Sequence, residues 1–374
     1  MARGFFVGTM KRLLVGGTLA LCFLSAAVLQ AAAAEITPQE RKLIPLAKKE
    51  GAVILLNTSI TEFTANELGK AFVRHYGLGS DFKFHNLKKG TGAALSQVRQ
   101  EFQANKSTAD VLQVSAPDFF DGAAKRGFFL PLDSGQWKFH AEVKKAGQYS
   151  NYPHVIVTNA YAFVPVWNTS CPGMANVNIT SYADTVAPSL KGKTISTDIT
   201  KSTTFTNTAV ALDESGFDLY GYWDKLKATD PIVEFRTEPK MQMVVSCERP
   251  IDAWNLPIRV RQYTLKKPEL RKFIKVGSYK EGHLMLGNQA AVLKGAPNPN
   301  AGKLFLEFLL TDEGANLVAK NEALYSFRQG WKVPPEAKEF MKELSEMKLI
   351  GLKDWVKAGE KFEAVRAEWI KRFK

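Results

Sequence analysis

Histidine and cysteine, the side chains that most often hold transition metals in proteins, are scarce in this sequence of 374 residues. None of the five histidines stands at a spacing typical of a metal site. The three cysteines, Cys22, Cys171 and Cys247, are far apart in the sequence. These residues are too few and too scattered for a zinc site, so we expect neither a metal nor another cofactor.

Acidic residues are fewer than basic ones. The 37 aspartates and glutamates face 50 lysines and arginines, which gives a formal net charge of +13 at pH 7. A balance this basic favours an anionic ligand or partner through long-range attraction. It does not indicate a nucleic acid, because the basic residues are scattered and no basic run is interleaved with aromatic side chains.

Long apolar runs are absent except near the N-terminus. The parts of that segment are, in order, the basic residues Arg3, Lys11 and Arg12, the apolar run 13–29, and the small residues Ala32, Ala33 and Ala34. This order is typical of a secretory signal, and we expect residues 1–34 to be a signal peptide that is removed after Ala34. The alternative is an uncleaved membrane anchor, since the run is nearly long enough to span a bilayer.

Export has consequences for the remaining chain, residues 35–374. Its length suits two domains, and loss of the three basic residues of the signal lowers the formal net charge from +13 to +10. In an oxidising compartment Cys171 and Cys247 are a candidate disulfide, and two buried free thiols are the alternative.

Catalytic and nucleotide-binding motifs are missing as well. Gly90-Thr91-Gly92 resembles the start of a dinucleotide-binding fingerprint, but Leu95 stands where the third glycine belongs. The sequence has no phosphate-binding loop, no zinc-protease motif and no nucleophile elbow. A secreted enzyme would need a nucleophile such as Ser59 or Ser115, and no histidine lies beside either in sequence. We therefore expect a protein that is not an enzyme.

Strand-like and helix-like segments alternate from residue 38 onward. The pattern predicts helices at 38–50, 62–76 and 93–104, and strands at 52–56, 81–87 and 111–114. A βαβαβ order of this kind is typical of a parallel sheet with helices on both faces.

Three small, polar loops follow the predicted strands, namely Asn57-Thr58-Ser59, Gly90-Thr91-Gly92 and Ser115-Ala116. In open α/β sheets the ligand binds beyond the carboxyl ends of the strands, where helices begin. Backbone N–H groups and the helix dipole favour an anion at such places. Ordinary capping and turn formation is the alternative interpretation of each loop taken singly.

A further set of segments has a pattern that can be compared with known families, namely 51–76, Gly90-Thr91-Gly92-Ala93 leading to Glu101, Ala109-Asp110-Val111, 164–169, 181–184, 190–193 and, as the most characteristic, 288–310. These segments resemble the ferric-type (family 1-like) extracellular solute-binding proteins of bacterial ABC importers. The resemblance covers nearly all of the chain after the signal.

The resemblance implies an α/β periplasmic binding protein of type II. In this fold two lobes, each a mostly parallel sheet flanked by helices, are joined by two crossover strands. We expect lobe one at 35–163 and 274–325, and lobe two at 164–273 and 326–374. The ligand would lie in the cleft, and hinge closure would be recognised by an inner-membrane ABC permease. We expect a periplasmic monomer with no nucleic-acid partner.

The resemblance also bears on the ligand. Iron-binding members use two adjacent tyrosines, a histidine and a glutamate, and the matching positions here fall near Pro257-Ile258, around Ser59 to Thr61, and near Gly92. None of these residues binds a hard cation strongly, which disfavours bare ferric iron and leaves an iron chelate as an alternative.

The residues of lobe two predict an organic anion instead, such as a carboxylate or a phosphonate. Arg249, Arg259 and Arg261 belong to the segment expected to reach the cleft, and a guanidinium binds such groups with two parallel hydrogen bonds. Solvated surface charge is the alternative for each arginine. Trp254 is a candidate for stacking on a flat ligand or a core residue, and Ser202 and Thr203 are candidate anion donors or plain helix caps.

Overall fold

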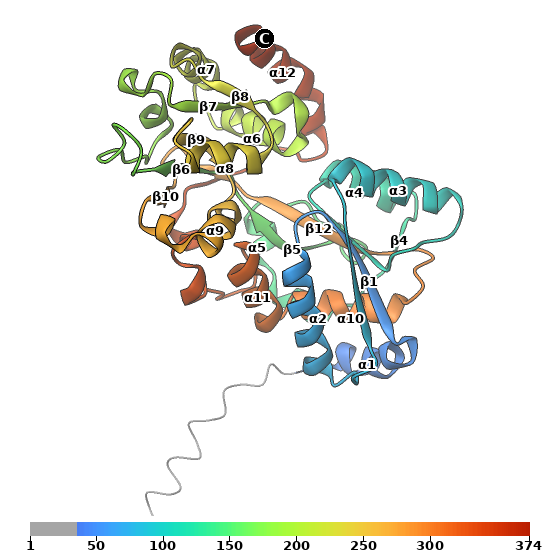
Figure 1. The fold of residues 1–374 in the computed structure, drawn as a ribbon. Helices are drawn as coiled ribbons and strands as arrows, with labels where there is room; N and C mark the ends of the chain where they lie inside the picture. The colour runs from blue at the N-terminus through green and yellow to red at the C-terminus, as the bar shows by residue number, and fades with distance from the viewer. Residues whose placement is uncertain (1–35) are drawn as a thin grey trace, which may run out of the picture. The chain divides into compact units, whose positions relative to one another are not determined.

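The computed structural model describes residues 36–374, and residues 37–374 form one compact unit. The predicted signal peptide, residues 1–34, lies outside the described residues. No helix between residues 36 and 374 is both long enough and apolar enough to cross a membrane. The strands form two larger sheets and one two-stranded sheet, which divide the fold into two lobes (Figure 1).

The first lobe is built on a six-stranded sheet. Its strands are β1 (Ala52–Asn57), β2 (Lys83–Lys88), β3 (Val111–Val114), β4 (Phe129–Leu130), β5 (Ile156–Tyr161) and β12 (Leu286–Leu293). Strands β2 and β3 run parallel to β1 on its two sides, while β12 runs antiparallel to β3, β4 and β5. Its helices are α1 (Pro38–Glu50), α2 (Glu62–Tyr76), α3 (Thr91–Gln103), α4 (Pro117–Lys125), α5 (Glu142–Lys145), α10 (Pro299–Leu309) and α11 (Asp312–Glu322).

Local signals explain why the first elements form where they do. Thr37 and Glu40 make a capping box at the start of α1, and Gly51 ends the helix with φ +72°. Thr61 caps α2, and Gly77 ends it at φ +58°. The predicted helices 38–50 and 62–76 and the strand 111–114 are confirmed. Helix α3 begins two residues earlier than expected, because Gly90 is its N-cap and Thr91 is already helical.

The second lobe contains a five-stranded sheet with the order β10-β6-β9-β7-β8. Its strands are β6 (Val164–Asn168), β7 (Thr194–Thr197), β8 (Ile232–Glu234), β9 (Ile251–Asn255) and β10 (Ile274–Val276). Strands β8 and β9 run parallel to β7, whereas β6 is antiparallel to both β9 and β10. Its helices are α6 (Thr203–Glu214), α7 (Leu219–Ala228), α8 (Thr237–Val245), α9 (Pro257–Lys266) and α12 (Phe362–Phe373).

Both sheets are mixed rather than mostly parallel. The parallel strands carry the βα loops, and the antiparallel strands bring the chain from one lobe to the other and back. The chain crosses between β5 and β6 and again between β10 and β12. The expected lobe boundary at residue 274 needs correction, because β10 pairs with β6 and so belongs to the second sheet.

The C-terminal segment contacts both lobes. Helix α12 packs against α6 and α7, as expected for a tail that covers the second lobe (Figure 1). Strand β13 (Leu349–Ile350) pairs with β11 (His283–Leu284). Residues 325–347, however, enter a core with β5 and α11 of the first lobe as well as with β6 and α9.

Short 3-10 turns lie at Trp137–Phe139, Tyr182–Val186, Pro188–Leu190, Ile199–Lys201, Pro268–Lys272, Pro335–Ala337, Leu344–Glu346 and Lys357–Lys361.

Cys171 and Cys247 form a disulfide in the second lobe, with their Cα atoms 5.4 Å apart. The disulfide, rather than two free thiols, is therefore the correct alternative. It ties the loop after β6 to the C-terminal end of α8.

Candidate functional site

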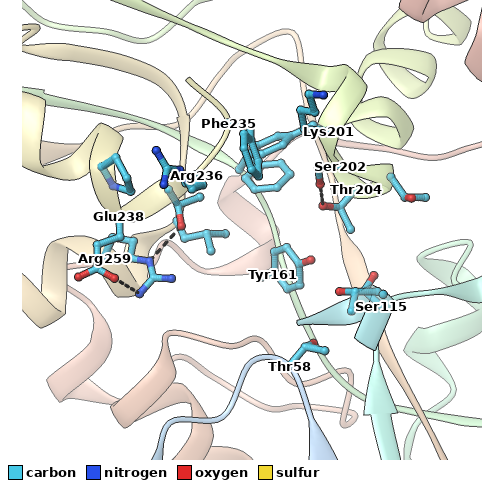
Figure 2. A pocket seen from close by; sticks show the side chains of 18 of the residues that line it. Thr58, Ser115, Tyr161, Lys201, Ser202, Thr204, Phe235, Arg236, Glu238 and Arg259 are labelled. Carbon is cyan, nitrogen blue, oxygen red and sulfur yellow. Dashed lines mark hydrogen bonds and ion pairs between the residues drawn. The ribbon is translucent and has the colours of Figure 1, made fainter. Parts of the chain in front are cut away.

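A cavity of about 910 Å³ lies between the two lobes (Figure 2). The first lobe lines it with Thr58, Thr91, Gly92, Leu95, Ser115 and Tyr161. The second lobe contributes Lys201, Ser202, Thr203, Thr204, Phe205, Phe235, Arg236, Thr237, Glu238, Pro239, Gln242, Leu256 and Arg259. Phe163, from the connection between β5 and β6, completes the lining.

The cavity lies at the carboxyl ends of all six parallel strands. In the first lobe the lining residues follow β1, β2 and β3, and in the second lobe they follow β7, β8 and β9. A helix begins directly after each of these loops, namely α2, α3, α4, α6, α8 and α9. Parallel sheets place such loops at one edge, and here the two edges face the same space.

The helices that begin at the cavity are poorly capped by side chains. Helices α3, α4, α6, α8 and α9 have no side-chain hydrogen bond at their N-caps, and α2 alone is capped, by Thr61. Helices α1, α7 and α11 begin outside the lining and are capped by Thr37, Asp218 and Thr311. At the start of α10 the carboxylate of Glu50 accepts hydrogen bonds from two backbone N–H groups. The N-cap N–H groups of α4, α8 and α9 donate to the side chains of Gln289, Glu234 and Asn255. The cavity therefore collects the N–H groups of the helical turns that follow these N-caps, and the positive ends of the helix dipoles.

Arg259 lines the larger cavity with part of its hydrogen-bonding capacity unused. Its Nε donates to Thr237 Oγ1 at 3.0 Å and its Nη1 to Gln262 Oε1 at 2.8 Å, while Glu238 Oε2 lies 3.9 Å from Nη1 (Figure 2). Its Nη2 makes no hydrogen bond to any residue from 36 to 374. Arg259 is half-buried and lines the cavity, so Nη2 and the remaining N–H of Nη1 are placed to bind an anion.

Arg236, which also lines the larger cavity, forms an ion pair with Glu234. Its Nε and Nη2 donate to the two oxygens of Glu234 at 3.1 and 2.9 Å. These hydrogen bonds are the main reason that the pKa of Glu234 falls to about 2. Lys201, by contrast, is exposed and forms no ion pair with any described residue, so it adds positive charge to the cavity rim.

Tyr161 stands between the lobes, at the end of β5. Its hydroxyl lies close to Ser115 of the first lobe and Thr204 of the second (Figure 2). Burial raises the pKa of Tyr161 to about 12, and hydrogen bonds to Thr204 and Ser115 oppose the rise. Tyr161 is therefore a neutral phenol that is able to donate or accept a hydrogen bond.

A buried ion pair fixes helix α8, which brings Thr237, Glu238 and Gln242 to the cavity. Lys240 Nζ donates to Asp252 Oδ1 at 3.1 Å, to Thr197 Oγ1 at 2.9 Å, and to the carbonyl of Trp254, and both charged side chains are fully buried. Burial lowers the pKa of Lys240, and the charge of Asp252 raises it. The pair links α8 to β7 and β9, the strands that carry the other second-lobe loops.

A second, smaller cavity of about 220 Å³ adjoins the first. The two share Thr58, Thr91, Tyr161, Leu256 and Arg259. The residues found only in the smaller cavity are Ser59, Gly90, Pro257, Ile258, Glu322, Ala323 and Leu324.

Most predicted site residues lie at these cavities. Thr58, Thr91, Gly92, Ser115, Ser202, Thr203 and Arg259 line the larger one, and Ser59 and Gly90 line the smaller one. Three predicted residues do not line either cavity. Asn57 is buried, where it donates to Asn86 Oδ1 and accepts from the Ile60 N–H. Trp254 is a core residue whose Nε1 donates to Tyr182 Oη at 2.8 Å, and Arg249 lies in the loop between α8 and β9.

Sequence reasoning missed Tyr161, Lys201, Thr204 and the segment 235–238. The segment follows β8, a parallel strand of three residues that are not fully buried and show no apolar run. The rule applied to the first lobe, that ligands bind after parallel strands, would have found it once β8 was recognised. Thr204 and Lys201 flank two residues that the same rule did select.

Residues 36–374 contain no group of three or more histidine, cysteine, aspartate and glutamate side chains that could hold a metal ion. Pro257, Ile258, Ser59 and Gly92, the positions aligned with iron ligands, do lie at the two cavities. They offer no carboxylate, imidazole or phenolate. No histidine of the described residues lines either cavity, so Ser59 and Ser115 have no imidazole base there.

Solved structures with the same architecture come from several bacteria. Iron-bound HitA from Pseudomonas aeruginosa is 20% identical, with a TM-score of 0.66 over 85% of this chain and 99% of that one. AfuA from Actinobacillus pleuropneumoniae, with bound fructose-6-phosphate, is 18% identical, with a TM-score of 0.65 over 86% and 98%. The FutA protein of Trichodesmium, in complex with iron and citrate, is 15% identical, with a TM-score of 0.63 over 86% and 99%. At these identities the likeness shows the fold, the two-lobed periplasmic binding protein.

The family of this chain is established by its sequence similarity to a family model. No curated protein matches it significantly, but residues 106–357, well over half of the chain, match the model of a family described as bacterial extracellular solute-binding proteins. Members of this family bind a solute for transport. The chain therefore belongs to the bacterial extracellular solute-binding proteins and has their two-lobed fold.

Proposed function

We propose that this chain captures a small organic anion, a carboxylate or a phosphonate, in the cavity between the lobes and delivers it to an ABC permease. The observation that carries the proposal is the set of five helix N-termini at the cavity without side-chain caps. Together with Arg259 and Lys201 they supply hydrogen-bond donors and positive potential. The role as an exported, monomeric receptor, with residues 1–34 as its signal peptide, belongs to the same proposal.

The ligands of the solved structures do not decide between ligand classes, since HitA holds iron, AfuA a sugar phosphate, and FutA iron with citrate. The lining of this chain supports an organic anion over a bare ferric ion. The oxygen atoms of the cavity wall that could bind a metal ion belong mainly to hydroxyl groups, and Glu238 supplies the carboxylate of the larger cavity. An iron chelate is the second candidate, because donors that bind a carboxylate would also bind the chelator, and a cavity of about 910 Å³ has room for one.

The proposal is tested by a thermal-shift screen of residues 35–374 against carboxylates, phosphonates, sugars and amino acids, and ferric salts with and without citrate. A ligand at 100 times its Kd stabilises the native state by about 2.7 kcal/mol, which raises the melting temperature measurably. The variant Arg259→Ala should weaken binding of the anion roughly 10- to 100-fold, since it removes charge-assisted hydrogen bonds worth about 1.5–3 kcal/mol.

Arg249→Ala is the matched control. Arg249 is half-buried like Arg259 but lines neither cavity, so its removal should leave the affinity unchanged. Stabilisation by free ferric ion alone, with no response to any organic anion, would refute the proposal. Equal losses of affinity in the two variants would show that Arg259 does not contact the ligand.

A further inference from the structure

The smaller cavity contains a buried carboxylate with one unused oxygen. Glu322 lies at the end of α11 and is only 2% exposed. Its Oε1 accepts hydrogen bonds from the backbone N–H of Thr61, at 2.7 Å, and from the Thr61 hydroxyl. Its Oε2 accepts no hydrogen bond from any residue between 36 and 374, and Glu322 lines the smaller cavity. Glu322 Oε2 is not one of the fully buried oxygens without a partner, so it is accessible from the cavity, and the cavity is the place from which a donor can come.

The backbone beside Glu322 is also unusual. Ala323 adopts φ +52°, a left-handed conformation that a residue with a Cβ rarely takes. This turn ends α11 and brings Ala323 and Leu324 into the cavity wall. Residues held in such conformations cluster at ligand-binding sites, where the surrounding structure sustains the strain.

The charges nearby indicate which donor fits. Arg259 lines both cavities, and Lys88 lies close enough to Glu322 and Arg259 for both to influence it. Desolvation lowers the pKa of Lys88, the charge of Glu322 raises it, and the charge of Arg259 lowers it. The cavity already contains the positive field of Arg259, which would repel a second cation but not a neutral hydroxyl.

We infer that the smaller cavity is a second subsite, in which Glu322 Oε2 accepts a hydrogen bond from a hydroxyl group of the ligand. The anionic group lies in the larger cavity against Arg259 and the helix N-termini, and Thr58 and Tyr161, shared by both cavities, line the passage between them. The ligand is then a hydroxylated organic anion, such as a hydroxy acid or a sugar phosphate. This inference rests on the proposed function.

Two matched sets of probes test it by calorimetry. The carboxylate set is gluconate, hexanoate and 6-aminohexanoate, which share a six-carbon chain and a carboxylate and differ in carrying hydroxyls, no polar group, or an ammonium. The phosphate set is glucose 6-phosphate, hexyl phosphate and 6-aminohexyl phosphate. We expect the hydroxylated member of the binding set to bind at least about 10-fold more tightly than the unsubstituted one, because a hydrogen bond to a buried carboxylate is charge-assisted.

The variant Glu322→Gln separates a ligand contact from a structural role. Its amide oxygen can still accept the hydrogen bonds from Thr61, while the amide nitrogen can only donate to a ligand hydroxyl, in a neutral hydrogen bond that is weaker than the charge-assisted one. The preference for the hydroxylated probe should fall about 10-fold, and the affinity for the unsubstituted probe should stay the same. Glu313→Gln, on the same helix but outside both cavities, should change neither.

The outcomes distinguish the subsite from the proposed function. Binding of an unsubstituted and a hydroxylated probe with equal affinity would refute the subsite and leave the anion receptor intact. A preference for the ammonium probe that depends on Glu322 would also overturn the hydroxyl assignment. Failure of every anion in both sets to bind would refute the proposed function and the subsite together. If Glu322→Gln does not fold, the selectivity of the unmodified protein still decides.

Discussion

Replacing Lys240 by methionine should destabilise the second lobe more than any surface substitution. The change keeps the length and much of the volume of the side chain but removes its ammonium. That ammonium donates to Thr197 Oγ1, Asp252 Oδ1 and the Trp254 carbonyl, all in a site with no exposed surface. Without it, the Asp252 carboxylate keeps a hydrogen bond from the Trp254 N–H at 3.0 Å and loses its counter-charge.

The expected cost follows from that uncompensated charge. Removing one partner of a buried ion pair typically costs about 3–5 kcal/mol, because the remaining charge stays desolvated. The double variant Lys240→Met with Asp252→Asn should be less destabilised than the single one, by roughly 2 kcal/mol, because it removes both charges. The asparagine can still accept the hydrogen bond from Trp254 through its side-chain oxygen.

Urea denaturation followed by circular dichroism and tryptophan fluorescence measures these differences. Lys225→Met is the control, since Lys225 is an exposed residue of α7, and its replacement should cost less than about 0.5 kcal/mol. A Lys240→Met variant as stable as this control would refute the reasoning. So would a double variant that is less stable than Lys240→Met alone.

Two further predictions concern redox state and pH. Replacing Cys171 and Cys247 together by serine should lower the free energy of unfolding by on the order of 4 kcal/mol, because the disulfide closes a loop with a sequence separation of 76; a urea titration that shows a loss below about 1 kcal/mol would contradict the chain-entropy account. Burial, reinforced by the charge of Glu40, raises the pKa of Glu307 to about 7. The contribution of its protonation to the free energy of unfolding is therefore fully present below the unfolded pKa of about 4.3, and it is lost as the pH rises through 7. Glu307→Gln should remove this decline, on the order of 4 kcal/mol at most, and an unchanged slope of melting temperature between pH 4 and 8 would contradict the assignment.

The elements of the first lobe could be predicted because their signals are local. Thr37 and Thr61 cap the first two helices, and Gly51 and Gly77 end them, so four residues in the sequence fix both helices within one residue. The loops after β1, β2 and β3 then followed from the general behaviour of parallel strands. No knowledge of the second lobe was needed for these predictions.

The side chain of Trp254 in the second lobe was harder to place than the loops of the first lobe. All five residues of β9 are buried, so no period of two shows which side Trp254 faces, and its direction depends on pairing with β6 and β7. The surroundings of Arg259 and Arg261 also depend on the direction in which each side chain points. Arg259 and Arg261 are two residues apart on α9 and so point to opposite sides; Arg259 lines the cavity, and Arg261 lies over the ring of Phe340.

The cavity wall also includes the chain segment that joins the lobes. Strand β5 ends at Tyr161 and β6 begins at Val164, and Tyr161 and Phe163 both line the cavity. Phe163 stacks on Phe205 of the second lobe with ring centroids 4.2 Å apart, and its carbonyl accepts a hydrogen bond from His283 Nδ1 in the other connection between the lobes. A ligand that fills the cavity therefore contacts the connection directly. We therefore expect the binding free energy gained at this connection to act directly on the relative placement of the lobes.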